Sequence, residues 1–445
     1  MPILATDLAG LGIQPGAAYY LANYLNSSTA LPRLPSNRSI AILGDSRTFQ
    51  CTAETATEYS KMSQGYIGWL QYLTRQRIDF ELDDNYGVSG ENTAQMYARI
   101  PEMLRSTDAG AIIFLGGTND WSYGFTALGA TSGQPPGGTD TLVNLEAIYT
   151  AIRNGGRICI MMAEMPRGDS TNTSSRLSAS NLKRQNKVRE YVLNLNEFGV
   201  YTVDPWQYLA LANATNGDCI EADFKDGLHP NASGAYYTAL ALQPLIESLY
   251  SPVNILPQAN SDVYDASLNP LGCLNSNPVM DGTGGTKNTG ASGNLADNWS
   301  ENATPGFTRT YSKVTSGGKT WQQVVLGGTA TATGISVRQV ITPGLLTVGD
   351  RIQAVCELEM DVDVSNIVAV SLQILDNGTI SSGDMRPTDT TMRIPAVATS
   401  GILETPIYTI TSTTIQIQIF MQVVAASNPV GTLRFARVSL RKIQD

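Results

Sequence analysis

Residues 39–45 read SIAILGD and residues 111–117 read AIIFLGG, two short apolar runs that both reach a glycine. The pattern returns in ICIMMAE at residues 158–164 and in VYTVD at residues 200–204. A continuous apolar run of this length is typical of a strand buried on both faces, because an exposed face would show alternating polar residues. The runs therefore predict a mostly parallel sheet that is covered on both sides.

Longer amphipathic stretches separate these runs. They include YIGWLQYLTRQ at 66–76, LVNLEAIYTAIRN at 142–154, LKRQNKVREYVLNLNEF at 182–198 and a closing helix, NASGAYYTALALQPLIESLY, at 231–250. Strands that alternate with helices of this length predict β-α units. We expect an α/β three-layer sandwich of the flavodoxin-like type, with helices on both faces of the sheet.

The second half of the chain has a different pattern. From residue 308, Thr, Val and Ile alternate at period two in segments such as RIQAVCELEMDVDV at 351–364 and TTIQIQIFMQVV at 413–424. Several such segments, separated by Gly, Pro, Asn and Asp turns, predict an all-β sandwich or jelly roll. Residues 254–306 are rich in Asn, Ser, Gly and Thr, which predicts a linker or long loops.

These patterns divide the chain into four predicted parts. They are an N-terminal helical or tether segment at 1–36, the α/β domain at 37–252, a linker at 253–266 and the β-sandwich at 267–445.

Composition limits the partners of the protein. The 445 residues are 42% hydrophobic and 15% charged, with a formal net charge of -10, so the chain is globular and has no basic surface of the size that nucleic acid needs. No window approaches eighteen consecutive apolar residues, so we expect no membrane span. The opening MPILATDLAG lacks the features of a secretory signal.

Cysteine and histidine counts restrict the chemistry. The five cysteines have no C-x-x-C spacing, and the single histidine is His229, so the sequence predicts neither a metal site nor a disulfide framework. We expect no cofactor. Any general base of the imidazole type must be His229.

Two short motifs combine into a hydrolytic site. Ser46 follows the first predicted strand at the carboxyl edge of the sheet, where open α/β sheets build their sites. Asp226 precedes His229 by three residues, a spacing that lets its carboxylate reach the imidazole and stabilise the protonated ring. A serine hydroxyl needs such a base to become a nucleophile.

Two further loops follow sheet elements and could bind an oxyanion. They are GVSGEN at residues 87–92 and GGTND at residues 116–120. An oxyanion hole needs free donors, and these loops offer the backbone N–H of Gly90 and the side-chain amide of Asn119.

Together the motifs ILGDS, GVSGEN, LGGTND and DGLHP, in this order, resemble the four blocks of the SGNH or GDSL hydrolases over roughly residues 38 to 250. The resemblance implies that Ser46 is the nucleophile, His229 the general base and Asp226 its orienting acid. It also implies that Ser46, Gly90 and Asn119 form the oxyanion hole. The chain departs from the family at Arg47, which stands where a small or apolar residue is common.

Some assignments stay open at this stage. Asp223, three residues before Asp226, is an alternative acid. Trp121 follows the asparagine block and is a candidate substrate-binding platform, with core packing as the alternative reading; Trp69 reads as a core residue.

The C-terminal part resembles the jelly-roll carbohydrate-binding modules of polysaccharide-active enzymes in pattern only. The alternative is a packing or oligomerisation sandwich with Trp299 and Trp321 in its core. With the hydrolase motifs, this suggests a serine esterase that removes short acyl groups, acetyl first, from a polysaccharide. The expected partner is an acetylated polysaccharide or another short-chain ester.

A second hypothesis is a virion or cell-surface structural protein, as in phage tails, whose hydrolase-like domain mainly binds glycan. The opening ATDLAGLGIQPGAAYYLANYL resembles those of some phage structural proteins. This setting would bring a homo-oligomer or a virion assembly as partner, and an extracellular or virion-associated location.

Overall fold

Strand β1 (Ile40–Gly44) of the α/β part pairs in parallel with β4 (Asn85–Gly87) on one side and with β5 (Ala111–Leu115) on the other. The computed structural model describes residues 37–54, 59–212, 214–303, 306–331, 334–388 and 391–444. The N-terminal segment predicted at 1–36 lies outside these residues.

Within the described ranges the parallel sheet has five strands in the order β4-β1-β5-β6-β7, which adds β6 (Ile158–Met162) and β7 (Tyr201–Val203). In order of appearance this is 2-1-3-4-5, the flavodoxin-like order. Gly44 is in register with Gly87 and with Leu115. The loops that follow β1, β4 and β5 therefore leave the sheet side by side.

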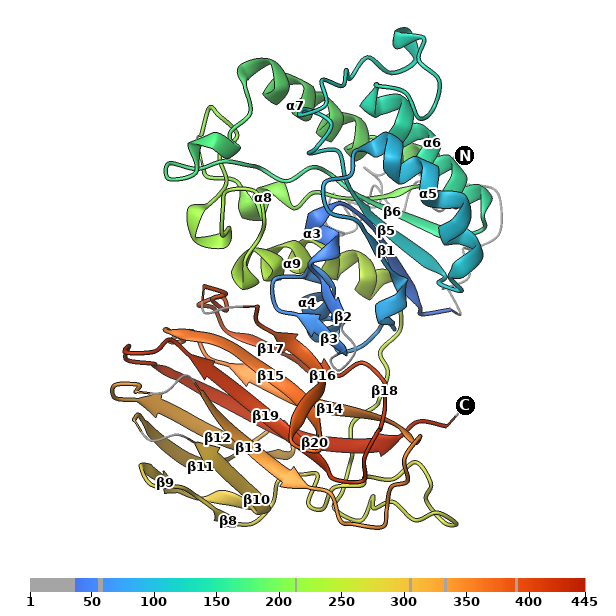
Figure 1. Ribbon diagram of the computed structural model, residues 1–445. Helices are drawn as coiled ribbons and strands as arrows, with labels where there is room; N and C mark the ends of the chain where they lie inside the picture. Colours follow the sequence, from blue (N-terminus) through green and yellow to red (C-terminus); the bar gives the residue numbers. More distant parts are fainter. Residues whose placement is uncertain are drawn as a thin grey trace, which may run out of the picture. The chain divides into compact units, whose positions relative to one another are not determined.

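Helices cover both faces of this sheet (Figure 1). Ala41 and Leu43 share a core cluster with α5 (Thr93–Ser106), α6 (Thr141–Asn154) and α7 (Ala179–Leu193). Ile40 and Ile42 share the other cluster with α4 (Tyr66–Leu73) and α9 (Ala232–Leu249). Because successive side chains of a strand point to opposite faces, β1 is buried throughout. The predicted α/β three-layer fold is confirmed.

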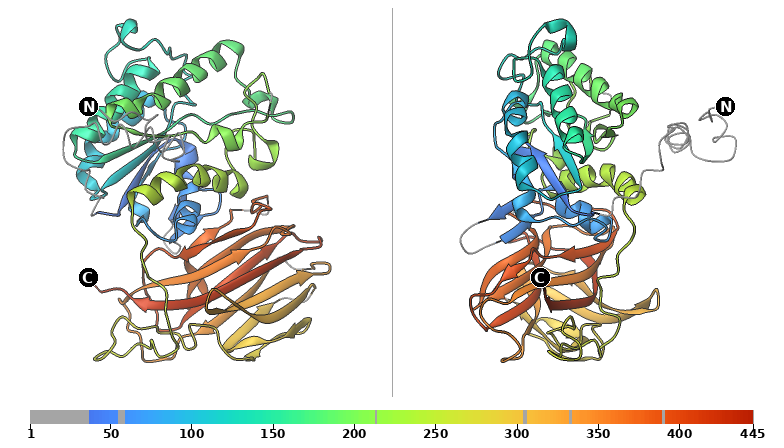
Figure 2. Two further views of the ribbon diagram at one scale, coloured as in Figure 1. Left: turned by 180° about the vertical axis from the view of Figure 1, so that it is seen from behind. Right: turned by 90° about the vertical axis from the view of Figure 1, so that its right-hand side faces the viewer.

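The C-terminal part is built mainly from antiparallel strands, as predicted (Figure 2). In the described residues one of its sheets has the order β2-β3-β16-β15-β19-β13-β10-β8. Its strands are β2 (Thr52–Glu54), β3 (Tyr59–Met62), β16 (Thr379–Arg386), β15 (Ile367–Asp376), β19 (Ile415–Val423), β13 (Gly334–Val340), β10 (Leu295–Ala303) and β8 (Gly284–Thr286).

The other sheet has the order β17-β14-β20-β12-β11-β9, with β18 paired to β14. Its strands are β17 (Thr399–Glu404), β14 (Arg351–Met360), β20 (Gly431–Lys442), β12 (Lys319–Gly327), β11 (Thr308–Ser316), β9 (Ala291–Gly293) and β18 (Tyr408–Thr409). Trp299 and Trp321 are each 1% exposed and lie in the core of this part, which fits the packing alternative for these two residues.

The α/β part contributes two strands to the larger sheet. β2 and β3 form a hairpin, and β3 pairs in parallel with β16 through Ser382 and Tyr59, Gly383 and Ser60, and Arg386 and Met62. The sheet is thus completed by residues that follow α3 (Ser46–Phe49), the first helix of the described residues, by only a few positions. Residues 38–445 form one compact unit.

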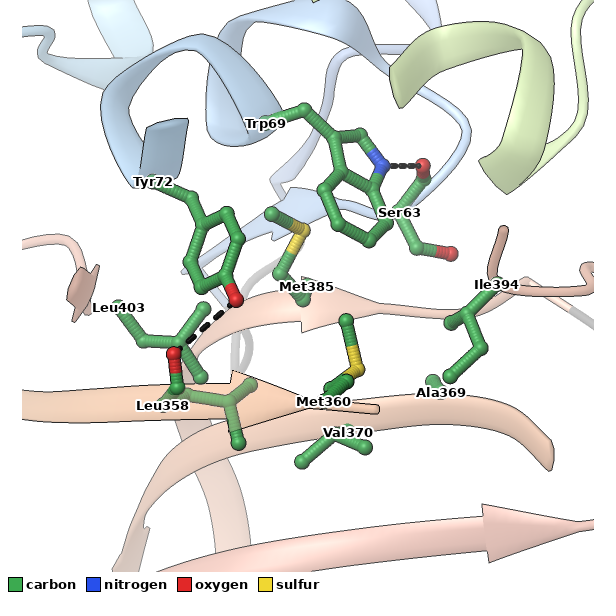
Figure 3. A pocket seen from close by; sticks show the side chains of 10 residues that line it. All are labelled: Ser63, Trp69, Tyr72, Leu358, Met360, Ala369, Val370, Met385, Ile394 and Leu403. Carbon is green, nitrogen blue, oxygen red and sulfur yellow. Dashed lines mark hydrogen bonds between the residues drawn. The ribbon is translucent and has the colours of Figure 1, made fainter. Parts of the chain in front are cut away.

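Helix α4 packs on the same β part. The Tyr72 hydroxyl donates to the carbonyl of Leu358 at 3.1 Å and lies 2.9 Å from Oγ1 of Thr399. Figure 3 shows Trp69 and Tyr72 facing Met385 across a small apolar cavity. The cavity is a packing defect between α4 and the strands, and none of the predicted site residues lines it.

No helix among the described residues combines the length and the apolar character that crossing a membrane requires.

Candidate active site

The position of Ser46 follows from the end of β1. A Cβ atom on Gly44 would lie 2.3 Å from the carbonyl oxygen of Leu115 and 2.3 Å from Oγ1 of Thr48, so only glycine fits where the chain leaves the sheet. Asp45 then caps α3 by accepting a hydrogen bond from the Arg47 N–H at 2.9 Å. Ser46 is the first residue of this helix and is half-buried at the carboxyl edge of the sheet.

Ser46, His229 and Asp226 form a continuous hydrogen-bonded chain. Oγ of Ser46 lies 2.8 Å from Nε2 of His229, and Nδ1 of His229 lies 2.7 Å from Oδ2 of Asp226. An ionised carboxylate can only accept, so Nδ1 carries the ring proton and Nε2 is left to accept the proton of Ser46. This is the tautomer that a general base requires.

The environment of Asp226 keeps its carboxylate ionised. Burial raises its pKa, but hydrogen bonds from the His229 ring and from the backbone N–H groups of His229 and Leu228 outweigh burial and lower the pKa to about 2. One oxygen accepts the two backbone hydrogen bonds while the other holds the ring. The carboxylate therefore fixes both the loop and the imidazole.

The loop that carries Asp226 is hydrogen-bonded to the segment that follows β6. Gly227 has φ +72, and a Cβ atom there would lie 2.9 Å from Cβ of Asn172. The Gly168 N–H donates to the carbonyl of Gly227 at 2.6 Å, and Oγ of Ser175 donates to the carbonyl of Asp226 at 2.8 Å. These contacts require glycine at position 227 and position the acid.

The two predicted oxyanion loops meet beside Ser46. Nδ2 of Asn119 donates to the carbonyl of Glu91 at 2.8 Å, which joins the loop after β5 to the loop after β4. Within the described ranges, the N–H groups of Ser46 and Gly90 have no hydrogen-bond partner, and neither does the second hydrogen of the Asn119 amide. Three donors thus stand free at the same edge of the sheet.

Asp120 connects these loops to the helices behind them. It is fully buried and accepts from the N–H and hydroxyl of Thr93 at 2.9 and 2.7 Å and from the hydroxyl of Thr141 at 2.6 Å. Burial raises its pKa to about 6 in spite of these hydrogen bonds. Asp120 is therefore a positioning residue for Asn119, its neighbour in the chain.

Arg47 has a structural explanation. Its side chain is 1% exposed and is bonded to Asp45 at 2.9 and 2.6 Å and to Glu164 at 2.9 and 3.1 Å. Burial alone would lower the pKa of the guanidinium, but the two carboxylates raise it above its usual value. The ion cluster ties α3 to the end of β6.

The structure does not support two of the candidates from the sequence. Asp223 accepts a hydrogen bond from Oγ of Ser233 at 2.7 Å and does not contact His229, so it does not serve as the alternative acid. Trp121 is 5% exposed and packs in the core with α5 and α6, so it does not fit the predicted role of a substrate platform. The exposed aromatic residue of this loop is Tyr123, at 58%.

Sequence reasoning missed the residues that support the site from the loop after β6, including Glu164 and Arg167. One signal could have found Glu164, because a carboxylate directly after the apolar run ICIMMA stands at the edge of the sheet that carries Ser46.

Comparison with known proteins supports the class of the α/β part. Residues 42–236 match the model of the GDSL-like Lipase/Acylhydrolase family. The match covers less than half of the chain but includes Ser46, Gly90, Asn119, Asp226 and His229. This part of the chain is therefore similar to the GDSL-like acylhydrolases.

Solved structures give weaker similarities. A GDSL-like lipase from Bacteroides thetaiotaomicron is 15% identical, with 52% of this chain and 96% of that chain covered and a TM-score of 0.35. A lipase/acylhydrolase from Enterococcus faecalis is 15% identical, with 49% and 99% covered and a TM-score of 0.35. An acetyl xylan esterase, AlAXEase, is 16% identical, with 46% and 98% covered and a TM-score of 0.35.

None of the curated proteins compared with the chain matches it.

Proposed function

We propose that this protein is a serine esterase that hydrolyses short-chain acyl esters, most specifically O-acetyl groups on a polysaccharide. The observation that carries the proposal is the hydrogen-bonded chain from Ser46 through His229 to Asp226. It stands beside N–H groups that have no partner in the described residues. Nucleophile, base and oxyanion donors are the three parts that acyl transfer needs.

In the proposed mechanism, Oγ of Ser46 attacks the ester carbonyl while Nε2 of His229 takes its proton. The carbonyl oxygen becomes an oxyanion that accepts from the N–H groups of Ser46 and Gly90 and from the amide of Asn119. When the intermediate collapses, His229 returns the proton to the leaving alcohol. A water molecule then attacks the acyl-enzyme and gives a proton to His229. The bond between the acyl group and Oγ of Ser46 breaks, the carboxylic acid leaves, and His229 returns the proton to Oγ of Ser46. Asp226 stabilises the imidazolium in each half.

Exposed aromatic side chains favour a sugar as the alcohol part of the ester. They are Phe49, at the end of α3 and 56% exposed, and Tyr123, in the loop after β5 and 58% exposed, and either ring offers an apolar face to a sugar. We further propose that the β part binds or positions the polymer.

The test measures acetate release from a chromogenic acetate ester and from acetylated polysaccharides. Wild type should release acetate, Ser46→Ala should not, and both should unfold at the same temperature. Ser63→Ala is the matched control, because the buried Ser63 hydroxyl has no hydrogen-bond partner among the described residues and Ser63 is not one of the site residues.

Equal turnover by wild type and Ser46→Ala would exclude the mechanism. If the folded wild type releases acetate from no ester, the hypothesis of a protein that only binds glycan is favoured instead.

A further inference from the structure

Arg167 lies between the two halves of the proposed site. It belongs to the segment after β6, and its Nη1 donates to the carbonyl and hydroxyl of Thr118 at 3.2 and 3.1 Å, while its Nε donates to the carbonyl of Ser175 at 2.7 Å. Thr118 directly precedes Asn119, and the hydroxyl of Ser175 holds the carbonyl of Asp226. The guanidinium therefore spans the oxyanion loop and the acid-histidine loop.

The charge of Arg167 has no partner of opposite sign in direct contact. All its hydrogen bonds go to neutral oxygens, and within the part of the chain that the structure describes it forms no ion pair. Arg47 shows the contrast, because two carboxylates bind its guanidinium. A half-buried cation without a counter-ion is costly to maintain, and a bound anion would offset that cost.

One nitrogen of Arg167 is available for a ligand. Among the described residues, Nη2 has no hydrogen-bond partner, and it is not one of the buried polar atoms that lack one, so it is reached by solvent. The side chain is half-buried, and the hydrogen bonds of Nε and Nη1 fix the direction of the group. Nη2 is thus a preoriented donor at the edge of the site.

The charged groups around Arg167 are already engaged. Burial and the Arg47 guanidinium lower the pKa of Arg167, whereas Glu164, Asp45 and Asp226 raise it. Asp45 and Glu164 are bonded to Arg47, and Asp226 is bonded to His229. None of these carboxylates forms a hydrogen bond or an ion pair with Arg167 in the described residues, so the free Nη2 donor fits an anionic group of the ligand.

We propose that Nη2 of Arg167 binds a carboxylate of the substrate, so that the esterase acts on acetyl groups of an acidic polysaccharide, one that contains uronic acid or a related sugar. This inference rests on the proposed esterase function and names its substrate class. A hydrogen bond between a guanidinium and a carboxylate is charge-assisted and stronger than one to a neutral hydroxyl. The contact would orient the sugar relative to Ser46 and the oxyanion donors.

The test compares an O-acetylated uronic acid glycoside with its carboxamide, which has the same shape and no charge. We expect wild type to show a kcat/KM for acetate release that is about tenfold or more higher on the carboxylate, mainly through KM. Arg167→Met should bring the ratio of the two kcat/KM values to about one. Arg167→Lys should retain part of the preference because it retains the charge.

The ratio of the two kcat/KM values distinguishes recognition of the substrate carboxylate by Arg167 from a purely structural role of Arg167 in the site loops. If Arg167 only holds Thr118 and Ser175, its replacement lowers both rates equally and the ratio does not change. Arg184→Met is the matched control, because Arg184 is a half-buried arginine on α7 that bonds to Asn181 of the same helix and, in the described residues, to none of the site loops. A wild-type ratio of one, or an unchanged ratio in Arg167→Met, would overturn the proposal.

Failure of the esterase function would be seen separately. If wild type hydrolyses neither compound, binding of the deacetylated uronic acid oligosaccharide is measured by calorimetry for wild type and Arg167→Met. Binding that depends on Arg167 would support the anion site even in a protein that does not hydrolyse esters. The absence of binding would reject it.

Discussion

Arg47 donates two hydrogen bonds to Glu164, at 2.9 and 3.1 Å, although 117 residues separate them in the chain. The pair is buried, and it connects the helix of Ser46 to the strand that leads to Arg167 and Ser175. The ion cluster of Arg47, Asp45 and Glu164 thus supports both sides of the site at once.

Replacing Arg47 with methionine should therefore be strongly destabilising. The change leaves the carboxylates of Asp45 and Glu164 buried without a cation, which typically costs about 3–5 kcal/mol in the free energy of unfolding. Denaturant unfolding measures this loss. Lys442→Met removes a half-buried ion pair with Asp350 and a cation–π contact with Tyr264, and should cost about 1–2 kcal/mol. Equal losses in the two variants would contradict the role given to the cluster.

The acid of the triad can be identified by comparing two aspartates three residues apart. In Asp226→Asn the amide would donate to Nδ1 of His229, which leaves the ring proton on Nε2 and prevents it from accepting from Ser46. We expect kcat to fall about 10⁴-fold. Asp223→Asn should retain most activity, because Asp223 contacts Ser233 and not His229. A larger loss in Asp223→Asn than in Asp226→Asn would reverse the assignment.

The amide of Asn119 should contribute to turnover and little to folding. Asn119→Ala removes one oxyanion donor, which typically lowers kcat about 10²- to 10³-fold with a smaller change in KM. Because the amide also holds the carbonyl of Glu91, a control must loosen the same loop without touching the site. Arg99→Met does so by breaking the bond between Arg99 and the Glu91 carboxylate. A loss in Arg99→Met as large as in Asn119→Ala would mean that the amide acts only through the loop.

Asp120 should make stability depend on pH. Its pKa of about 6 in the folded protein lies above the ordinary value of 3.8, so the folded state binds more protons between these two pH values. Stability contributed by this group is therefore lost as pH rises from about 4 to 6, by up to about 3 kcal/mol. The free energy of unfolding of wild type minus that of Asp120→Asn should fall across this range. A difference that is flat with pH would contradict the raised pKa of Asp120.

The contact between α4 and the β part should also be measurable. Tyr72→Phe leaves the carbonyl of Leu358 without its side-chain partner and removes the contact with Thr399, which should lower the free energy of unfolding by about 1–3 kcal/mol. Tyr123→Phe alters an exposed hydroxyl and should change the free energy by less than about 0.5 kcal/mol. No difference between these variants would mean that the Tyr72 hydrogen bonds contribute nothing.

The parts of the fold that could be predicted from the sequence are those whose pattern is local. The run AIIFLGG marks β5 because its burial on both faces needs continuous apolar residues. The alternation of apolar and polar residues in RIQAVCELEM marks β14, because successive side chains of a strand point to opposite faces of the sheet. By contrast, the stretch expected as linker or loops contains β10, whose residues LADNWSENA show no clear apolar alternation.

The site residues that could be predicted are those that stand in short sequence motifs. Ser46, Asp226 and His229 could be named because each stands in a short motif, and the structure places them within hydrogen-bonding distance. Their catalytic roles stay predictions. From the sequence, Trp121 is the candidate for an exposed aromatic residue, whereas the structure buries Trp121 and exposes Tyr123. Which of the two side chains is exposed depends on the direction of the turn that carries them, and the sequence does not specify this direction. The carbohydrate-binding, oligomeric and virion hypotheses, and the domain boundaries at 252 and 266, also stay predictions.

The pairing of β3 with β16 has a consequence for how such proteins recombine and for how they can be engineered. A crossover anywhere between residues 62 and 379 would take the β2–β3 hairpin from one parent and its neighbour in the sheet from another. The α/β part cannot then be exchanged as an independent unit, because its β3 would have to pair with a β16 from another parent. Chimeras should retain solubility only when hairpin and β16 come from the same parent.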